Sequence, residues 1–144
     1  MSLPAPHPGL VLRYSYLWHA EHLQGREEGV KDRPCAVILV TQMEDDLVQV
    51  TVLPITHSPP RRADMAIEIP AATKMRLGLD TDRSWVVLDE ANRFIWPGPD
   101  LRPVGGGSGS AAYGVLPPRF FEAIKSRFLA LAKAHHGTTI DRTE

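Results

Sequence analysis

The segment "RPCAVILVTQMEDDLVQVTVLPIT" (33–56) decides how the rest of the chain is interpreted. Two apolar runs rich in β-forming residues, 35–42 and 47–55, flank "MEDD" (43–46), which has the composition of a turn. We therefore expect an antiparallel hairpin with one apolar face. An arginine and a proline stand directly before the first run, although a guanidinium is costly to bury and proline cannot donate a ladder hydrogen bond. Their position calls for a structural or a catalytic explanation.

The remaining sequence predicts a mostly β domain that ends in one strong helix. In 117–137, apolar residues recur at three- and four-residue steps, Pro118 suits a first helical turn and Gly137 suits a C-terminal stop. We expect the helix to pack across a small, partly open barrel. Other strands are expected at 9–18, 65–69, 84–90 and 92–96, the last two separate or joined as one bent strand, with one or two helical turns at 71–79.

Length and composition fit one globular domain. The chain has 144 residues, and we expect a loose leader at 1–8, a single domain at 9–137 and a disordered tail at 138–144. The formal net charge of −1 provides no global basic field, so any nucleic-acid binding must use a local patch. The single cysteine, Cys35, cannot form an internal disulfide, and no apolar run is long enough to span a membrane. These features predict a cytoplasmic protein.

Five segments carry a resemblance to a known family. A long glycine-bearing loop (19–32) leads to "RP" (33–34), which is followed by "PIT" (54–56), "SWVVLD" (84–89) and "YGVL" (113–116) before the helix. In this order, from about residue 9 to 134, they resemble the MazF/PemK family, the ribonuclease toxins of type II toxin–antitoxin pairs. The resemblance implies an SH3-like barrel, a homodimer, a cognate antitoxin partner and cleavage of single-stranded RNA without a metal or other cofactor.

The resemblance also assigns catalytic residues. The family's arginine before proline corresponds to Arg33, and its hydroxyl residue after the "Pro-x" strand end corresponds to Thr56. An acidic position in the preceding loop corresponds to Glu27 or Glu28. The chemistry is compatible, because the planar guanidinium can stabilise the extra charge of a phosphorane and a hydroxyl can position the phosphate. Pro34 would stiffen the entry to the strand and hold the arginine at its rim.

Further candidates lie around this pair. His57 directly follows Thr56 and is a possible auxiliary acid or base, because histidine changes charge near neutral pH. Arg61 and Arg62 form a small basic cluster that we expect to contact RNA phosphates. Many family members carry glutamine and a basic residue in the late strand, where this chain has Glu90 and Asn92. Asn92 is the predicted RNA contact of that strand.

Each candidate also has a plainer interpretation. Arg33 could be a rim arginine paired with Asp32 or Glu28, and Thr56 could satisfy a turn. "HAEH" (19–22) has three side chains that could bind zinc if a fourth ligand came from elsewhere. "GGGSGS" (105–110) resembles a phosphate cradle but lacks the following Lys-Ser/Thr, which favours a flexible loop.

Two other classes of function compete with the ribonuclease. A non-enzymatic toxin resembling the gyrase poison CcdB would share the fold, but that family ends in Trp-Gly-Ile whereas this chain ends in "TTIDRTE" (138–144). A catalytically silent binding module would keep the barrel without the chemistry, and the departures at Glu90 and Asn92 support it.

Overall fold

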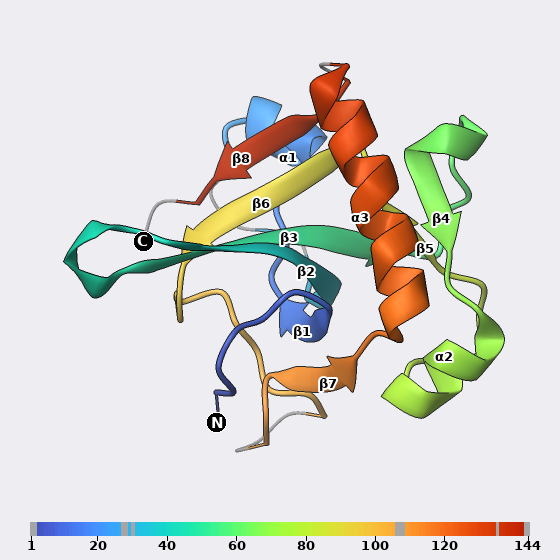
Figure 1. Ribbon diagram of the computed structural model, residues 1–144, viewed down its shortest axis with the longest axis horizontal. Helices are drawn as coiled ribbons and strands as arrows, with labels where there is room; N and C mark the ends of the chain where they lie inside the picture. Colours follow the sequence, from blue (N-terminus) through green and yellow to red (C-terminus); the bar gives the residue numbers. More distant parts are fainter. Residues whose placement is uncertain (1–2, 27–28, 30, 106–108, 135, 143–144) are drawn as a thin grey trace.

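The chain folds into an open, mostly antiparallel β-sheet that is crossed by its C-terminal helix, as the computed structural model shows (Figure 1). The structure describes residues 3–26, 29, 31–105, 109–134 and 136–142. The helices are α1 (His19–Leu23), α2 (Ala71–Leu77) and α3 (Pro118–Lys133), with short 3₁₀ turns η1 (Glu44–Asp46) and η2 (Ala63–Met65). The strands are β1 (Leu10–Tyr14), β2 (Arg33–Gln42), β3 (Val48–Thr56), β4 (Ala66–Glu68), β5 (Trp85–Val87), β6 (Glu90–Ile95), β7 (Ala112–Val115) and β8 (Thr138–Asp141).

The predicted hairpin is confirmed as the centre of the sheet. Strands β2 and β3 pair from Cys35 with Pro54 to Gln42 with Val48, and β1 and then β7 extend the sheet beyond β2. The other edge of β3 is shared, because its first half pairs with β6 and its last two residues pair with β5. The order β4-β5-β3-β2-β1-β7 does not close on itself, and β6 and β8 branch from β3.

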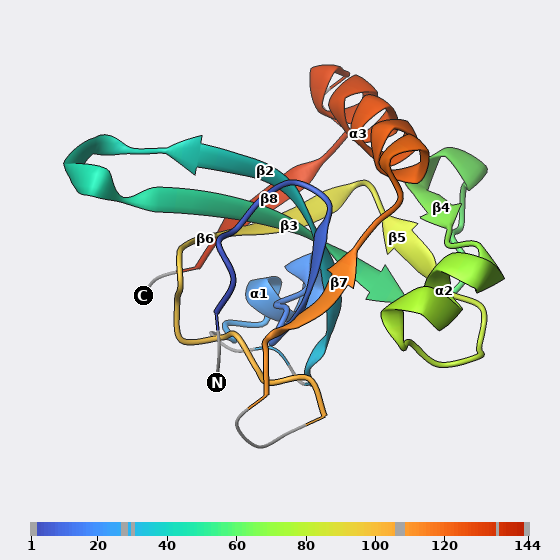
Figure 2. The same ribbon diagram turned by 60° about the horizontal axis from the view of Figure 1, so that its bottom comes forward.

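The hairpin buries apolar side chains on both faces, whereas the sequence analysis expected one apolar face. Val37 packs in one core with Tyr14 and Phe94, whose rings stack at 4.8 Å between centroids. Its neighbour Ile38 packs in the other core, under Ile124 of α3. Figure 2 shows α3 above the strands and α1 below them. Two-sided burial explains why 35–40 is an almost uninterrupted apolar run rather than an alternating one.

Helix α3 confirms the strongest helical prediction. Its side chains Ile124 and Leu131 are buried against the sheet, and Pro118 occupies its first turn.

In the part of the chain that the structure describes, no helix combines the length and the apolar character needed to cross a bilayer. Strands β5 and β6 are separate, as one of the two alternatives expected.

A buried polar network joins four distant segments. The Asn92 side chain is fully buried, donates to the carbonyl oxygen of Leu17 (2.8 Å) and accepts from its N–H (2.9 Å). The Arg142 guanidinium donates to Asn92 Oδ1 (3.1 Å) and to the Ser15 carbonyl (2.8 Å), and it pairs with Asp100 at 3.0 Å. The end of β1, β6, the loop before β7 and the C-terminal segment are thereby tied together.

The predicted disordered tail at 138–144 is wrong over its first residues. Residues 138–141 form β8, which pairs in parallel with β6, and Ile140 is buried. This segment is short and mostly polar, so its sequence shows no strand pattern. It is ordered because Ile140 is buried and because the Arg142 guanidinium pairs with the buried Asp100 carboxylate. Residues 143 and 144 lie outside the described part.

Two long segments interpreted as loops contain regular structure. Helix α1 lies within 19–32, and β7 begins within 97–114 and ends at Val115. Both elements are too short to produce a periodic signal in the sequence. Gly29 lies against the end of β1, where a Cβ atom would overlap the carbonyl oxygen of Tyr16. The loop can follow this path only because glycine lacks a side chain.

Replacing Asn92 with alanine should destabilise the fold. The substitution leaves a buried N–H and a buried carbonyl of Leu17 unpaired, which costs about 2–4 kcal/mol in total. Urea unfolding followed by far-UV circular dichroism measures the loss. Gln42→Ala is the control, because Gln42 also donates to two backbone carbonyls but is exposed, so water replaces its bonds. Equal losses in the two variants would contradict the structural role of Asn92.

Candidate functional site

A cleft of about 530 Å³ opens where β2 begins and β3 ends, beside α2 and β7. It is lined by Arg33, the first residue of β2, by Thr56, the last residue of β3, and by His57. Cys35 pairs with Pro54, so the same register carried two residues outward sets Arg33 opposite Thr56. The hairpin geometry therefore brings together the two residues that the sequence assigned to catalysis.

Among the described residues, Arg33 contacts an aromatic ring and forms no ion pair with a carboxylate. Its guanidinium carbon lies 4.8 Å from the centroid of the Trp18 ring, within the range of a cation–π interaction. Asp32, one of the two partners that the plainer interpretation named, is within 4 Å of Arg13 and Arg102 instead. The other, Glu28, lies outside the described residues. The Nε atom of Arg33 is buried and has no hydrogen-bond partner among the described residues. Buried donors of this kind are rare in native proteins and call for an explanation, of which a ligand is one.

Thr56 both stabilises a turn and lines the cleft. Its Oγ1 accepts a hydrogen bond from the backbone N–H of Ser58 at 3.1 Å, which is the turn that the plainer interpretation expected. A hydroxyl that accepts one bond still has its own proton to donate. Because Thr56 is half-buried at the wall of the cleft, that proton is available to a bound phosphate oxygen.

His57 is linked to a buried lysine through an aspartate. His57 Nε2 lies 2.7 Å from Asp80 Oδ2, and Asp80 Oδ1 accepts from Lys74 Nζ at 2.6 Å. The Lys74 side chain is buried and also donates to Ser84 Oγ (2.7 Å) and to the backbone carbonyl of Asp82. These bonds, with that from Lys74 the largest cause, lower the pKa of the Asp80 carboxyl. The aspartate therefore stays charged and orients the imidazole at the edge of the cleft.

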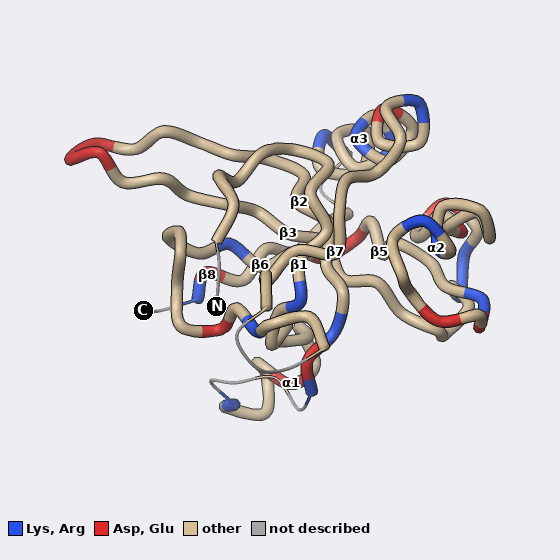
Figure 3. Tube along the Cα trace, turned by 90° about the horizontal axis from the view of Figure 1, so that it is seen from below, with Lys and Arg blue, Asp and Glu red and all other residues tan. Residues whose placement is uncertain are grey.

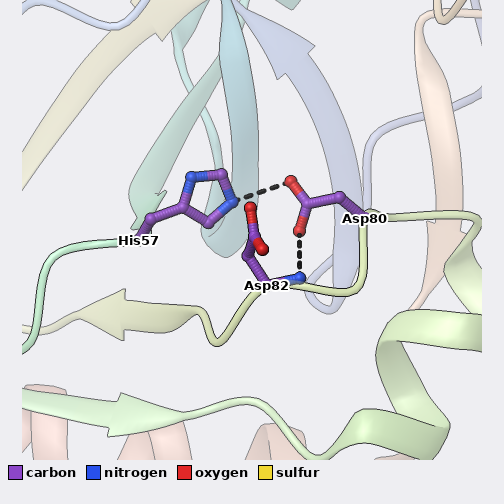
Figure 4. A group of neighbouring side chains, drawn as sticks. All are labelled: His57, Asp80 and Asp82. Atoms are coloured by element: carbon purple, nitrogen blue, oxygen red, sulfur yellow. Dashed lines mark hydrogen bonds and ion pairs between the residues drawn. The ribbon is translucent and has the colours of Figure 1, made fainter.

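His57, Asp80 and Asp82 lie close enough to offer three ligand atoms to a cation (Figure 4). Their ligand atoms are within 4.8 Å of one another. The Lys74 ammonium already neutralises Asp80 at its other oxygen, which weakens the attraction of this group for a second positive charge. We therefore interpret the cluster as a device that orients His57.

A second cleft, of about 500 Å³, adjoins the first and contains the basic cluster. Arg61 and Arg62 are both exposed on its wall, and Arg62 pairs with Asp64 at 2.8 Å. The two clefts share Trp18, Thr56 and Ser58. The expected RNA-binding arginines therefore flank the Arg33 and Thr56 cleft without entering it.

The predicted RNA contact at Asn92 is wrong. The side chain is fully buried and all its described hydrogen bonds join parts of the fold, so it has no surface to offer to RNA. In a strand whose residues alternate between core and surface, the sequence alone does not show whether a polar side chain such as that of Asn92 faces the core or the solvent. Glu27 and Glu28, the acidic loop candidates, lie outside the described residues.

Neither of the other sequence motifs forms a site. Within the described residues, "HAEH" (19–22) does not bring three ligand atoms together, and Glu21 accepts from the backbone N–H of Trp18 at the start of α1. "GGGSGS" (105–110) leads into β7 and not into a helix, as a phosphate cradle would require. Residues 106–108 of this motif are outside the described part.

Several residues that line the first cleft were not identified as site residues from the sequence. Lys74 and Asp80 flank Gly78, which ends α2 in the left-handed conformation, and Trp18 follows the first strand. The helical turns at 71–79 were expected, but nothing local indicates that a lysine within them is buried. Tyr113 also lines the cleft, and burial raises the pKa of its phenol above the ordinary value.

Comparison with models of protein families, with curated proteins and with solved structures gives no match to this chain. The functional argument therefore depends on the cleft itself. The cleft combines a fixed cation at Arg33, a hydroxyl at Thr56 and an oriented imidazole at His57. This set can bind a phosphate, stabilise added negative charge on it and move a proton.

Asp80→Asn should change how stability depends on pH. Because the folded protein lowers the pKa of Asp80 below its ordinary 3.8, the charged form contributes stability above that value. The contribution is lost as the pH falls through the lowered pKa. The gap in unfolding free energy between wild type and Asp80→Asn should therefore be constant above about pH 5 and narrow at lower pH.

Urea unfolding at several pH values between about 2 and 7 measures this gap. Asp46→Asn in the exposed turn of the hairpin controls for the loss of a charge. A gap that stays the same down to the lowest pH would contradict the interaction of Asp80 with Lys74 and His57.

Proposed function

We propose that this protein is a ribonuclease that cleaves single-stranded RNA without a metal or other cofactor, as the toxin of a type II toxin–antitoxin pair. The proposal includes membership of the MazF/PemK family and an SH3-like arrangement of the branched sheet. One observation carries it: Arg33 and Thr56 meet in one cleft, with the Arg33 Nε–H buried and unpartnered among the described residues.

The cleft residues suit a transesterification at the RNA backbone. The 2′-oxygen of one ribose forms a bond to the neighbouring phosphorus while the bond from phosphorus to the 5′-oxygen breaks. His57 takes the 2′-hydroxyl proton as neutral imidazole and returns a proton to the departing 5′-oxygen. The products are a 2′,3′-cyclic phosphate and a free 5′-hydroxyl, so no water is consumed in this step.

Arg33 and Thr56 act on the phosphate in this scheme. The guanidinium faces the phosphate oxygens and stabilises the charge that accumulates in the phosphorane. Stacking on Trp18 fixes the guanidinium before substrate binds, so little reorganisation is needed during the reaction. Thr56 donates to one phosphate oxygen, and Asp80 keeps the imidazole of His57 oriented.

Arg33→Ala should reduce RNA cleavage by about 10²–10³-fold, which is the usual cost of removing a donor that stabilises the transition state. Arg33→Lys should recover only part of the rate, because an ammonium lacks the planar fork. Thr56→Val should have a smaller effect. Cleavage of a labelled single-stranded RNA in excess EDTA measures all three, and a substrate with a 2′-deoxy sugar at the cut position should bind but resist cleavage.

Arg93→Ala is the matched control for this experiment, because Arg93 pairs with Asp141 away from both clefts and its loss should leave the rate unchanged. Wild-type rates in a folded Arg33→Ala protein would remove the mechanism. Cleavage that stops in EDTA, or that proceeds at the deoxy position, would also contradict it. A wild-type protein that binds RNA without cutting it would identify the silent binding module.

We also propose a two-fold homodimer and a cognate antitoxin as partners. The open sheet leaves strands β4 and β7 at its ends, and Val115 on β7 and Leu129 on α3 are exposed apolar side chains. Light scattering should give twice the chain mass of 15.9 kDa at micromolar concentration. A mass equal to one chain would contradict the dimer.

A further inference from the structure

The second cleft provides a place for an RNA base next to the cleavage site. We propose that it binds a nucleobase that neighbours the scissile phosphate, and that Glu90 selects bases with an exocyclic amino group. This inference rests on the proposed ribonuclease function and names the part of the substrate that the chain would read.

The two clefts adjoin at the residue that is proposed to contact the phosphate. Thr56 and Ser58 line both of them, and Trp18 forms part of both walls. A phosphate at Arg33 and Thr56 therefore leaves its adjoining nucleoside directly beside the second cleft. No other described cleft shares Thr56 with the first.

The walls of the second cleft suit a flat, partly apolar group. Pro59, Pro60, Met65 and Val87 line it together with the indole of Trp18. Aromatic and apolar side chains of this kind accept bases by stacking, whatever the base sequence. Arg61 and Arg62 on the same wall are exposed and suit the phosphates that enter and leave.

Glu90 is the fixed hydrogen-bond acceptor of this cleft. Its Oε1 accepts from the hydroxyl of Tyr16 (3.0 Å) and from the backbone N–H of His19 (3.1 Å), which holds the carboxyl in one orientation. Its Oε2 accepts no hydrogen bond from the described residues. Burial raises the pKa of the carboxyl above its ordinary 4.5. Hydrogen bonds in such a partly desolvated place are electrostatically stronger than in water.

An acceptor in this position discriminates between bases. Cytosine, adenine and guanine carry an amino group that donates to a carboxylate, as in the pairing of glutamate with the cytosine amino group. Uracil presents carbonyl oxygens on both sides of its single N–H, and these repel the carboxylate. Asp89 lines the same cleft and adds a second negative charge, which disfavours an anionic group there.

The test compares cytosine with uracil, which differ in the amino group and the ring proton. The probes are fluorescent 2′-O-methyl oligonucleotides of C or U, which cannot be cut because the 2′-oxygen is blocked. Wild type should bind the C probe about tenfold more tightly by fluorescence anisotropy, the discrimination of one good contact. Glu90→Gln should bind both probes about equally, because the amide offers a donor as well as an acceptor.

Glu90→Gln is expected to fold, because the amide oxygen can still accept from Tyr16 and His19. Glu44→Gln in the exposed turn is the control for charge and should keep the cytosine preference. In a second arm, cut positions are mapped in RNA of random sequence. Wild type should avoid uracil on one side of the cut, and Glu90→Gln should lose that bias.

The outcomes separate this inference from the proposed function. A cytosine preference that disappears in Glu90→Gln, in a protein that cuts no RNA, would support the base site and overturn the ribonuclease. Cutting without any base bias, or a bias that survives in Glu90→Gln, would overturn the base site alone. An acidic peptide that binds when neither oligonucleotide does would assign the cleft to a protein partner and also overturn it.

Discussion

The pairing of Arg142 with Asp100 and Asn92 is the constraint on which the rest of the structure depends. A guanidinium and a carboxylate are removed from water there, and this is tolerated because they pair with each other and the guanidinium also donates to Ser15 and Asn92. The network joins the last strand to the first, so the two ends of the chain stabilise the same core. It also fixes Leu17, and with it the start of the segment that carries Trp18 to the cleft.

The two-sided core has a direct effect on the candidate site. Strands β2 and β3 are packed above and below, so the positions where they end are determined by the same contacts that stabilise the fold. Arg33 and Thr56 occupy those ends. At the opposite end the hairpin projects from the sheet, and its turn carries acidic residues (Figure 3). The two ends of the hairpin thus differ in charge.

Local patterns predicted the parts of the fold that local contacts determine. The hairpin has two apolar runs around a turn and α3 has periodic apolar residues, and the pairing of Cys35 with Pro54 brings Arg33 and Thr56 to the same end of the hairpin. Strand β8, the burial of Asn92 and the position of Lys74 were not predicted. Each depends on partners far along the chain, and a polar residue in a short segment carries no local sign of them.

The stacking of Arg33 on Trp18 gives the protein a built-in optical reporter. Indole emission depends on nearby charges and on contact with water, and Trp18 borders both clefts while its ring lies beside a cation. Of the other two tryptophans, Trp85 is buried in β5 and Trp96 packs against Phe94, and neither lines these clefts. In a protein with phenylalanine at 85 and 96, the emission spectrum would follow occupation of the site without any attached dye.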